Sequence, residues 1–203
     1  MARNLEPKHK MCRKYGEKLC DSVKCPTARR SYPPGQHGPN QKGHKKISGY
    51  GRQLREKQKV KKIYGILERQ FSNYVAEASK KTGDTSIILV TFLESRLDNV
   101  VYRLGLASSR RAARQLVSHG HIAVNGKKLN IPSYRARIGE SVGVLAADKG
   151  KTIFLPLAEK LAKVETPAWL SIDAKSLTGK VLNSPIVDNL HFDAKSIIEF
   201  YSR

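Results

Sequence analysis

The pattern of apolar and polar positions predicts helices in the middle of the chain. The stretch RQLREKQKVKKIYG begins at Arg52 and ends at Gly65, a residue type that commonly terminates helices. LERQFSNYVAEASKKTG spaces its apolar residues near helical periodicity and ends in Lys80, Lys81 and Gly83, which suits a helix C-terminus. We therefore expect two consecutive helices in this part of the chain.

A second pair of helices, followed by strands, is predicted further along. SRLDNVVYRLG places its apolar residues on one helical face, and SSRRAARQLVSHG begins at a natural N-cap, Ser108 or Ser109, and ends at Gly120. HIAVNGKKLNI contains two alternating runs joined by Asn125 and Gly126, the strongest short hairpin signal. GESVGVLAA supplies another strand, so the order helix, helix, hairpin, strand predicts a small α+β module.

The remaining stretches give weaker signals. The first 50 residues contain YPPGQHGPNQKG and no apolar periodicity, which predicts a loop-rich segment. TSIILVTFL is rich in β-branched residues, which favour a strand, but an apolar run this short could also be a buried helix. TPAWLSIDAKSLTGKVL suggests extended pieces with Trp169 as an anchor, and DAKSIIEFYSR a short C-terminal helix or strand.

Charge narrows the possible partners. The chain has 203 residues, 39% of them apolar, and a net charge of +21. Residues 1–62 hold 18 Lys or Arg against four acids, and residues 108–140 hold seven against one. Two separate basic blocks favour a nucleic acid as partner, with an anionic membrane as the rival. We see neither a long apolar run nor an apolar signal sequence, so we expect a soluble intracellular protein.

Two arginines occupy an unusual place in the second basic block. Arg110 and Arg111 fall in the first turn of a predicted helix, where the helix dipole disfavours cations by about 0.3–1 kcal/mol each. A phosphate bound at that helix end would meet free backbone N–H groups together with both guanidinium groups. The placement therefore indicates a phosphate-binding helix end. The alternative interpretation is exposed helix charges without a partner.

The sequence of this module resembles a known RNA-binding family. SRLDNVVYRLG and SRRAARQLVSHGHIAVNGKKLNIPSYRARIGE resemble the S4 RNA-binding domain. The flanking YPPGQHG, LREKQKVKKIYGILERQF and IIEFYSR extend the resemblance over the whole chain, to the bacterial small-subunit ribosomal protein S4 family. The resemblance implies a structural, non-enzymatic protein that binds the 5′ domain of 16S ribosomal RNA early in 30S assembly. It implies a cytoplasmic location in the ribosome, as one copy.

The resemblance also implies an architecture. The fold class expected is α+β: a mostly helical domain with an inserted small αα-β-hairpin RNA-binding domain and a loop-rich N-terminal segment. The corresponding boundaries are 1–50 for the basic N-terminal segment, 51–93 plus 159–203 for the helical domain, and 94–158 for the inserted domain. On this basis we expect TSIILVTFL to be helical, although its residues locally favour a strand.

The expected RNA contacts combine the basic pattern with the resemblance. They are Arg52, Arg55, Lys59, Lys62, Arg96, Arg103, Ser108, Ser109, Arg110, Arg111, Arg114, Gln115, His119, Lys127, Lys128, Tyr134, Arg135 and Arg137. The basic loop after PPGQHG, with Lys42, Lys45 and Lys46, corresponds in the family to a region near the mRNA entrance. Ribosomal proteins S5 and S3 would be neighbours there, with a contribution to translational accuracy through S5. No membrane or small-molecule substrate is expected.

Three cysteines and a histidine form a possible metal site. His9, Cys12, Cys20 and Cys25 give the pattern H-x2-C-x7-C-x4-C, a legitimate zinc ligand set in a segment without a core of its own. Many members of the family bind zinc through four cysteines in this region, and here His9 stands where the first cysteine would be. We expect Zn²⁺; the alternatives are three reduced cysteines with a solvated histidine, or an iron–sulfur cluster.

Two other functions compete with the one that the resemblance implies. An RNA-modifying enzyme that carries the same module would need a separate catalytic domain, and no stretch is left to supply one. A zinc-dependent DNA-binding regulator would need a recognition helix after the cysteines, but PTARRSYPPGQHG breaks helices. The sequence shows no P-loop, no G-x-G-x-x-G and no catalytic triad pattern.

Overall fold

The computed structural model describes residues 6–20, 22, 24–39, 47–157, 161, 165–185 and 192–202. The chain divides into two compact units, Met1–Ile87 with Leu190–Arg203, and Ile88–Asn189. Helix α4, Thr85–Glu94, runs through the division. In the described ranges, no helix combines the length and apolar character needed to cross a bilayer. The finer division expected from the sequence stays a prediction.

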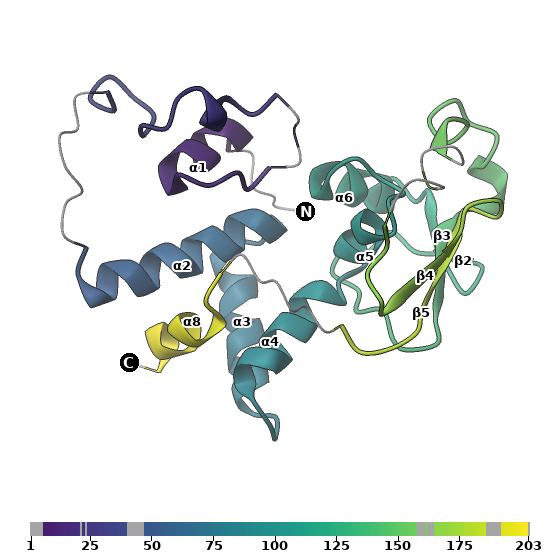
Figure 1. Ribbon diagram of the computed structural model, residues 1–203. Coiled ribbons are helices and arrows are strands. Elements are labelled where there is room, and N and C mark those ends of the chain that lie inside the picture. The colour runs from purple at the N-terminus through teal and green to yellow at the C-terminus, as the bar shows by residue number, and fades with distance from the viewer. Residues whose placement is uncertain are drawn as a thin grey trace. The chain divides into compact units, whose positions relative to one another are not determined.

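The first unit is helical. It contains α1 (Lys8–Tyr15), the short 3₁₀ helix η1 (Pro26–Ala28), α2 (Gly49–Tyr64), α3 (Glu68–Ser79) and α8 (Ala194–Tyr201). The Ser48 side chain caps α2 by accepting a hydrogen bond from the Gly51 amide at 3.1 Å, and Gly65 ends the helix with a left-handed φ of 64°. Figure 1 shows α8, from the C-terminus, beside α2 and α3.

A charged cluster joins α2, α3 and α8. Glu68 on α3 accepts hydrogen bonds from Lys57 of α2 at 2.9 Å and from the Tyr201 hydroxyl of α8 at 2.7 Å, and Lys61 also pairs with it. The Lys57 ammonium lies 4.3 Å from the centroid of the Phe200 ring. Burial alone would raise the pKa of Glu68, but these hydrogen bonds lower it to about 2. The Glu68 carboxylate thus links the C-terminal helix α8 to α2 and α3.

The second unit packs α5 (Leu97–Arg103) and α6 (Arg110–Ser118) on a small antiparallel sheet (Figure 1). The strands are β1 (Ile122–Val124), β2 (Lys127–Lys128), β3 (Ser141–Val144), β4 (Leu170–Asp173) and β5 (Thr178–Val181), in the order β2-β1-β3-β5-β4, and η2 covers Ala146–Asp148. Val101, Val117, Ile122 and Trp169 lie in one buried core. A Cβ at Gly179 of β5 would lie 2.4 Å from the side chain of Leu104, the residue that follows α5, so glycine permits this close packing.

The β1–β2 hairpin confirms the turn signal in the sequence. Asn125 and Gly126 both take positive φ, 50° and 76°. The Asn125 side-chain oxygen also accepts a hydrogen bond from the Ser141 amide at 2.9 Å, which ties the turn to β3. The same Asn-Gly dipeptide therefore sets the hairpin and its register against the next strand.

The α+β class is confirmed, and several ambiguous stretches are resolved. TSIILVTFL is the helix α4, as the family resemblance implies, and DAKSIIEFYSR contains the helix α8. The extended pieces expected near Trp169 are β4 and β5, which join the sheet through β3. The helix α1 falls in the segment predicted to be loop-rich, because its eight residues are too few to display helical periodicity in the sequence.

We expect Glu68→Gln to lower stability at pH 7 and to flatten its acid dependence. The pKa of Glu68 lies below its usual value of 4.5 in the folded protein. Its stabilising contribution is therefore complete above about pH 4.5 and lost as the pH falls toward 2. Urea unfolding followed by circular dichroism at pH 7 and pH 3 measures this. Tyr201→Phe, which removes one hydrogen bond, should give a smaller effect, and equal acid dependence of wild type and Glu68→Gln would contradict the assignment.

Candidate nucleic-acid interface and cysteine cluster

The first turn of α6 is organised around Ser109, Arg110 and Arg111. The Ser109 hydroxyl caps the helix by accepting from the Ala112 amide at 3.3 Å. The Arg110 guanidinium lies 4.5 Å from the centroid of the Tyr102 ring, and its Nε–H donates to the side-chain oxygen of Asn99 at 2.8 Å. Arg111 is exposed. Stacking and hydrogen bonding thus offset the unfavourable helix dipole at Arg110 within the protein itself.

A fully buried carboxylate lies behind this turn. Glu94, with no exposed surface, accepts two parallel hydrogen bonds from Arg103, at 3.0 and 2.9 Å. It also accepts from the Asn99 amide nitrogen at 2.8 Å. This contact orients the Asn99 amide with its oxygen toward Arg110. A chain of hydrogen bonds therefore runs from the buried Glu94 through Asn99 to Arg110.

A second buried carboxylate, Asp98, holds two further arginines. Its oxygens accept from Arg96 at 3.1 and 2.9 Å, and Arg114 of α6 lies 3.9 Å away. Arg96, expected from the sequence to contact RNA, has no exposed surface, and its guanidinium is an interior ion-pair partner of Asp98 in this structure. Asp98 and Glu94 thus place two carboxylates in the interior of this unit, each paired with an arginine.

The cations expected in the hairpin and the segment after it also belong to this unit. Lys127 and Lys128 are exposed on β2, and Arg137 is exposed beyond it. Arg135 stacks on Phe92 at 4.0 Å. The Tyr134 hydroxyl donates to Glu140 at 2.7 Å, a contact that raises the pKa of Tyr134.

The other expected contacts of this unit, Ser108, Gln115 and His119, are exposed.

The four cations expected on α2 are engaged with the N-terminal segment to different degrees. Lys59 is buried and pairs with Glu17 at 2.6 Å, and Lys62 pairs with Glu6 at 2.6 Å. Arg55 donates to the Tyr15 carbonyl at 2.9 Å, while Arg52 is exposed. Lys59 is therefore a structural ion-pair partner in this structure. Lys42, Lys45 and Lys46 lie outside the described residues.

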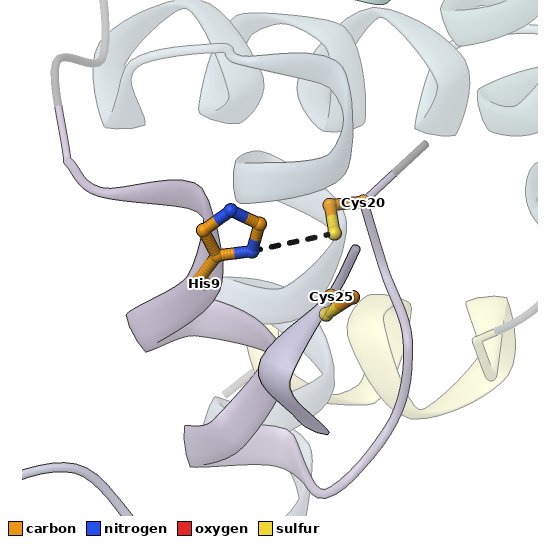
Figure 2. A group of neighbouring side chains, drawn as sticks. All are labelled: His9, Cys20 and Cys25. Carbon is orange, nitrogen blue, oxygen red and sulfur yellow. Dashed lines mark hydrogen bonds between the residues drawn. The ribbon is translucent and has the colours of Figure 1, made fainter. Parts of the chain in front are cut away.

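His9, Cys20 and Cys25 converge on one point. Their nitrogen and sulfur atoms all lie within 4.8 Å of one another, and the Cys20 sulfur is 3.9 Å from Nδ1 of His9 (Figure 2). His9 comes from α1 and Cys25 immediately precedes η1, so the fold brings together residues 16 positions apart. This cluster has the atoms and spacing to hold a metal ion.

Cys12 belongs to the same buried group, packed with Cys20 and Cys25. Burial raises the pKa of the Cys12 thiol to about 12. Burial would also raise the pKa of Cys25, but hydrogen bonds with Thr27, His9 and Cys20 lower it to about 6. The four positions selected from the sequence therefore gather in one place. The Cys25 thiol ionises more readily than the Cys12 thiol.

Sequence reasoning missed the acids and the amide that organise the arginines. Glu94, Asp98 and Asn99 are almost fully buried, although they look like ordinary polar residues in ESRLDN. The available signal was their position between two apolar runs, where a helical interior leaves little room for solvated charge. The individual pairings depend on tertiary structure and carry no local pattern.

The chain matches two family descriptions in tandem. Residues 3–94 match "Ribosomal protein S4/S9 N-terminal domain", and residues 95–142 match "S4 domain". Proteins named small ribosomal subunit protein uS4 are 48% identical in Caldicellulosiruptor bescii, 47% in Thermus thermophilus and 48% in Dictyoglomus turgidum, with 100% of both chains covered in each comparison. Identity at this level over the full length shows that this chain belongs to the uS4 family of small-subunit ribosomal proteins.

Proposed function

We propose that this protein is a primary 16S rRNA-binding constituent of the small ribosomal subunit, which binds the RNA 5′ domain and nucleates 30S assembly. The uS4 family consists of structural ribosomal proteins rather than enzymes. What supports the finer proposal is the set of arginines fixed around the start of α6, above all the Glu94–Asn99–Arg110 chain.

The geometry suits a folded RNA backbone. Arg110 and Arg103 are held by buried partners, so little side-chain entropy remains to be lost when a phosphate binds. The backbone N–H groups at the start of α6 point toward the same end of the helix. Exposed Lys127, Lys128 and Arg137 would add long-range attraction and counterion release. These contacts position the RNA without reading its bases.

The same proposal covers the neighbours of the protein in the subunit. The basic loop with Lys42, Lys45 and Lys46, which falls outside the described residues, would correspond to the region near the mRNA entrance, with ribosomal proteins S5 and S3 as neighbours. Arg52 on α2 would contact the RNA backbone. The contribution to translational accuracy would act through S5. This part rests on the family and on the basic composition of residues 1–62.

We also propose that the cysteine cluster holds Zn²⁺ through Cys20, Cys25, His9 and Cys12. Thiolates and a neutral imidazole form a Cys₃His set that suits this ion. The low pKa of Cys25 favours the thiolate that a metal requires. The ion would crosslink a segment whose described apolar contacts consist mainly of these cysteines and Leu19. It would thereby hold α1 and η1 together.

Arg110→Ala combined with Arg111→Ala is expected to weaken binding to the 16S 5′ domain and to reduce the slope of log affinity against log salt by about 1–2. Both residues are surface or half-buried, so folding should persist. The matched control is Lys175→Ala with Lys180→Ala, which removes equal charge from the exposed β4–β5 turn and β5. An unchanged slope in the arginine variant would count against phosphate contacts at α6.

Asn99→Ala should lower affinity about tenfold, or about 1.4 kcal/mol, and leave the salt slope unchanged. Arg110 keeps its charge in this variant but loses the acceptor that orients it. Asn130→Ala, an exposed asparagine in the segment after the hairpin, serves as the control. Affinity equal to wild type in a folded Asn99→Ala protein would show that the orientation of Arg110 is unimportant.

Purified protein should contain about one equivalent of zinc by elemental analysis, because the ligands are gathered in the folded segment. Cys25→Ser should reduce the zinc content and increase hydrogen exchange at the amides of α1. Less than about a tenth of an equivalent, with exchange protection of α1 intact, would rule out a structural zinc site.

A further inference from the structure

A cavity of about 730 Å³ opens beside α6 in the second unit. Ala112, Gln115, Leu116 and His119 form one wall. Their spacing of three, one and three residues places them on a single face of the helix. The lining also includes Ile153, Pro156 and Leu157 from a later segment of the same unit. The size falls within the range of about 300–1,000 Å³ that ligand-binding cavities have.

The lining combines an apolar floor with a polar edge. Leu106, Leu116 and Leu157 are apolar, whereas Ser108 and Gln115 can donate and accept hydrogen bonds. A nucleobase has this same division, with two apolar faces and a polar edge. An aliphatic chain would leave the polar groups of the cavity unused.

Charge around the cavity favours an occupant attached to phosphate. Arg103 lines it but is already paired with the buried Glu94, so the cation that offers a phosphate contact there is Arg111, one helical turn before Gln115 on the same exposed side of α6. One acid, Glu165, also lines this cavity among the residues described there, and could accept a hydrogen bond from an exocyclic amino group. A phosphate at Arg111 would therefore place its own base, or the next one, at the mouth of the cavity.

We propose that this cavity receives one unstacked base of the RNA whose phosphates the α6 arginines bind. The inference rests on the proposed rRNA-binding function and adds a contact that depends on a base rather than on the backbone. Single-stranded bases in loops and junctions are recognised by proteins in this way, through their faces and their hydrogen-bonding edges. Gln115 and Ser108 would contact the edge of the base, and the leucines its face.

Filling the cavity tests the proposal. Ala112→Leu adds volume to the cavity wall and keeps a good helix former. We expect its affinity for a transcript of the 16S 5′ domain to fall at least about tenfold with an unchanged salt slope, because the phosphate contacts remain. Ser118→Leu, which adds the same side chain at an exposed position of α6 outside the cavity lining, should bind like wild type.

Gln115→Ala provides a second variant that keeps the cavity open and, at an exposed position, should not disturb folding. It is expected to weaken binding severalfold.

Wild-type affinity in both cavity variants would overturn the base-binding inference, while a reduced salt slope in the Arg110 and Arg111 variant would still support the proposed function. Normal RNA affinity combined with failure of Ala112→Leu to enter small subunits would indicate a protein occupant and also overturn it. Wild-type protein that binds the transcript no better than transfer RNA would remove the proposed function and this inference together.

Discussion

The buried pairing of carboxylates with guanidinium groups is the constraint on which the RNA-binding unit depends. Glu94 and Asp98 lie in the interior, and each accepts two hydrogen bonds from an arginine. A buried carboxylate that loses its partner destabilises a protein by about 3–5 kcal/mol. The fold therefore requires Arg103 and Arg96 in fixed positions. Asn99 donates to Glu94 and accepts from Arg110, so it fixes the orientation of the Arg110 guanidinium at the start of α6.

This arrangement connects the two kinds of recognition that we propose. The network fixes cations at one end of α6, where backbone N–H groups also favour an anion. The next turns of the same helix form the wall of a cavity with an apolar floor and polar edge. Phosphate and base would thus be held by one rigid helix, and the spacing between them would be set by the helical repeat. If the hydrogen-bond network loosened, the phosphate contact and the base contact would both lose their fixed positions.

Local patterns were enough to predict much of the fold. Gly65 and the Asn125-Gly126 dipeptide act through their own backbone conformations, so their roles are visible in the sequence. TSIILVTFL needed the family resemblance, because tertiary burial rather than propensity makes it helical. In the site, the basic face of α6 and the four positions of the cysteine cluster were predictable from residue type and spacing. The pairing of Glu94 and the depth of the cavity were not, since both arise from residues brought together only by folding.

The central claim is that the arginines are held in place before RNA binds. Nuclear magnetic resonance of the arginine Nε–H groups in the RNA-free protein tests it most directly. We expect slow solvent exchange and restricted motion for the Nε–H of Arg103 and Arg110, which donate to Glu94 and Asn99, compared with the exposed Arg137. Exchange and mobility as fast at Arg103 and Arg110 as at Arg137 would contradict it.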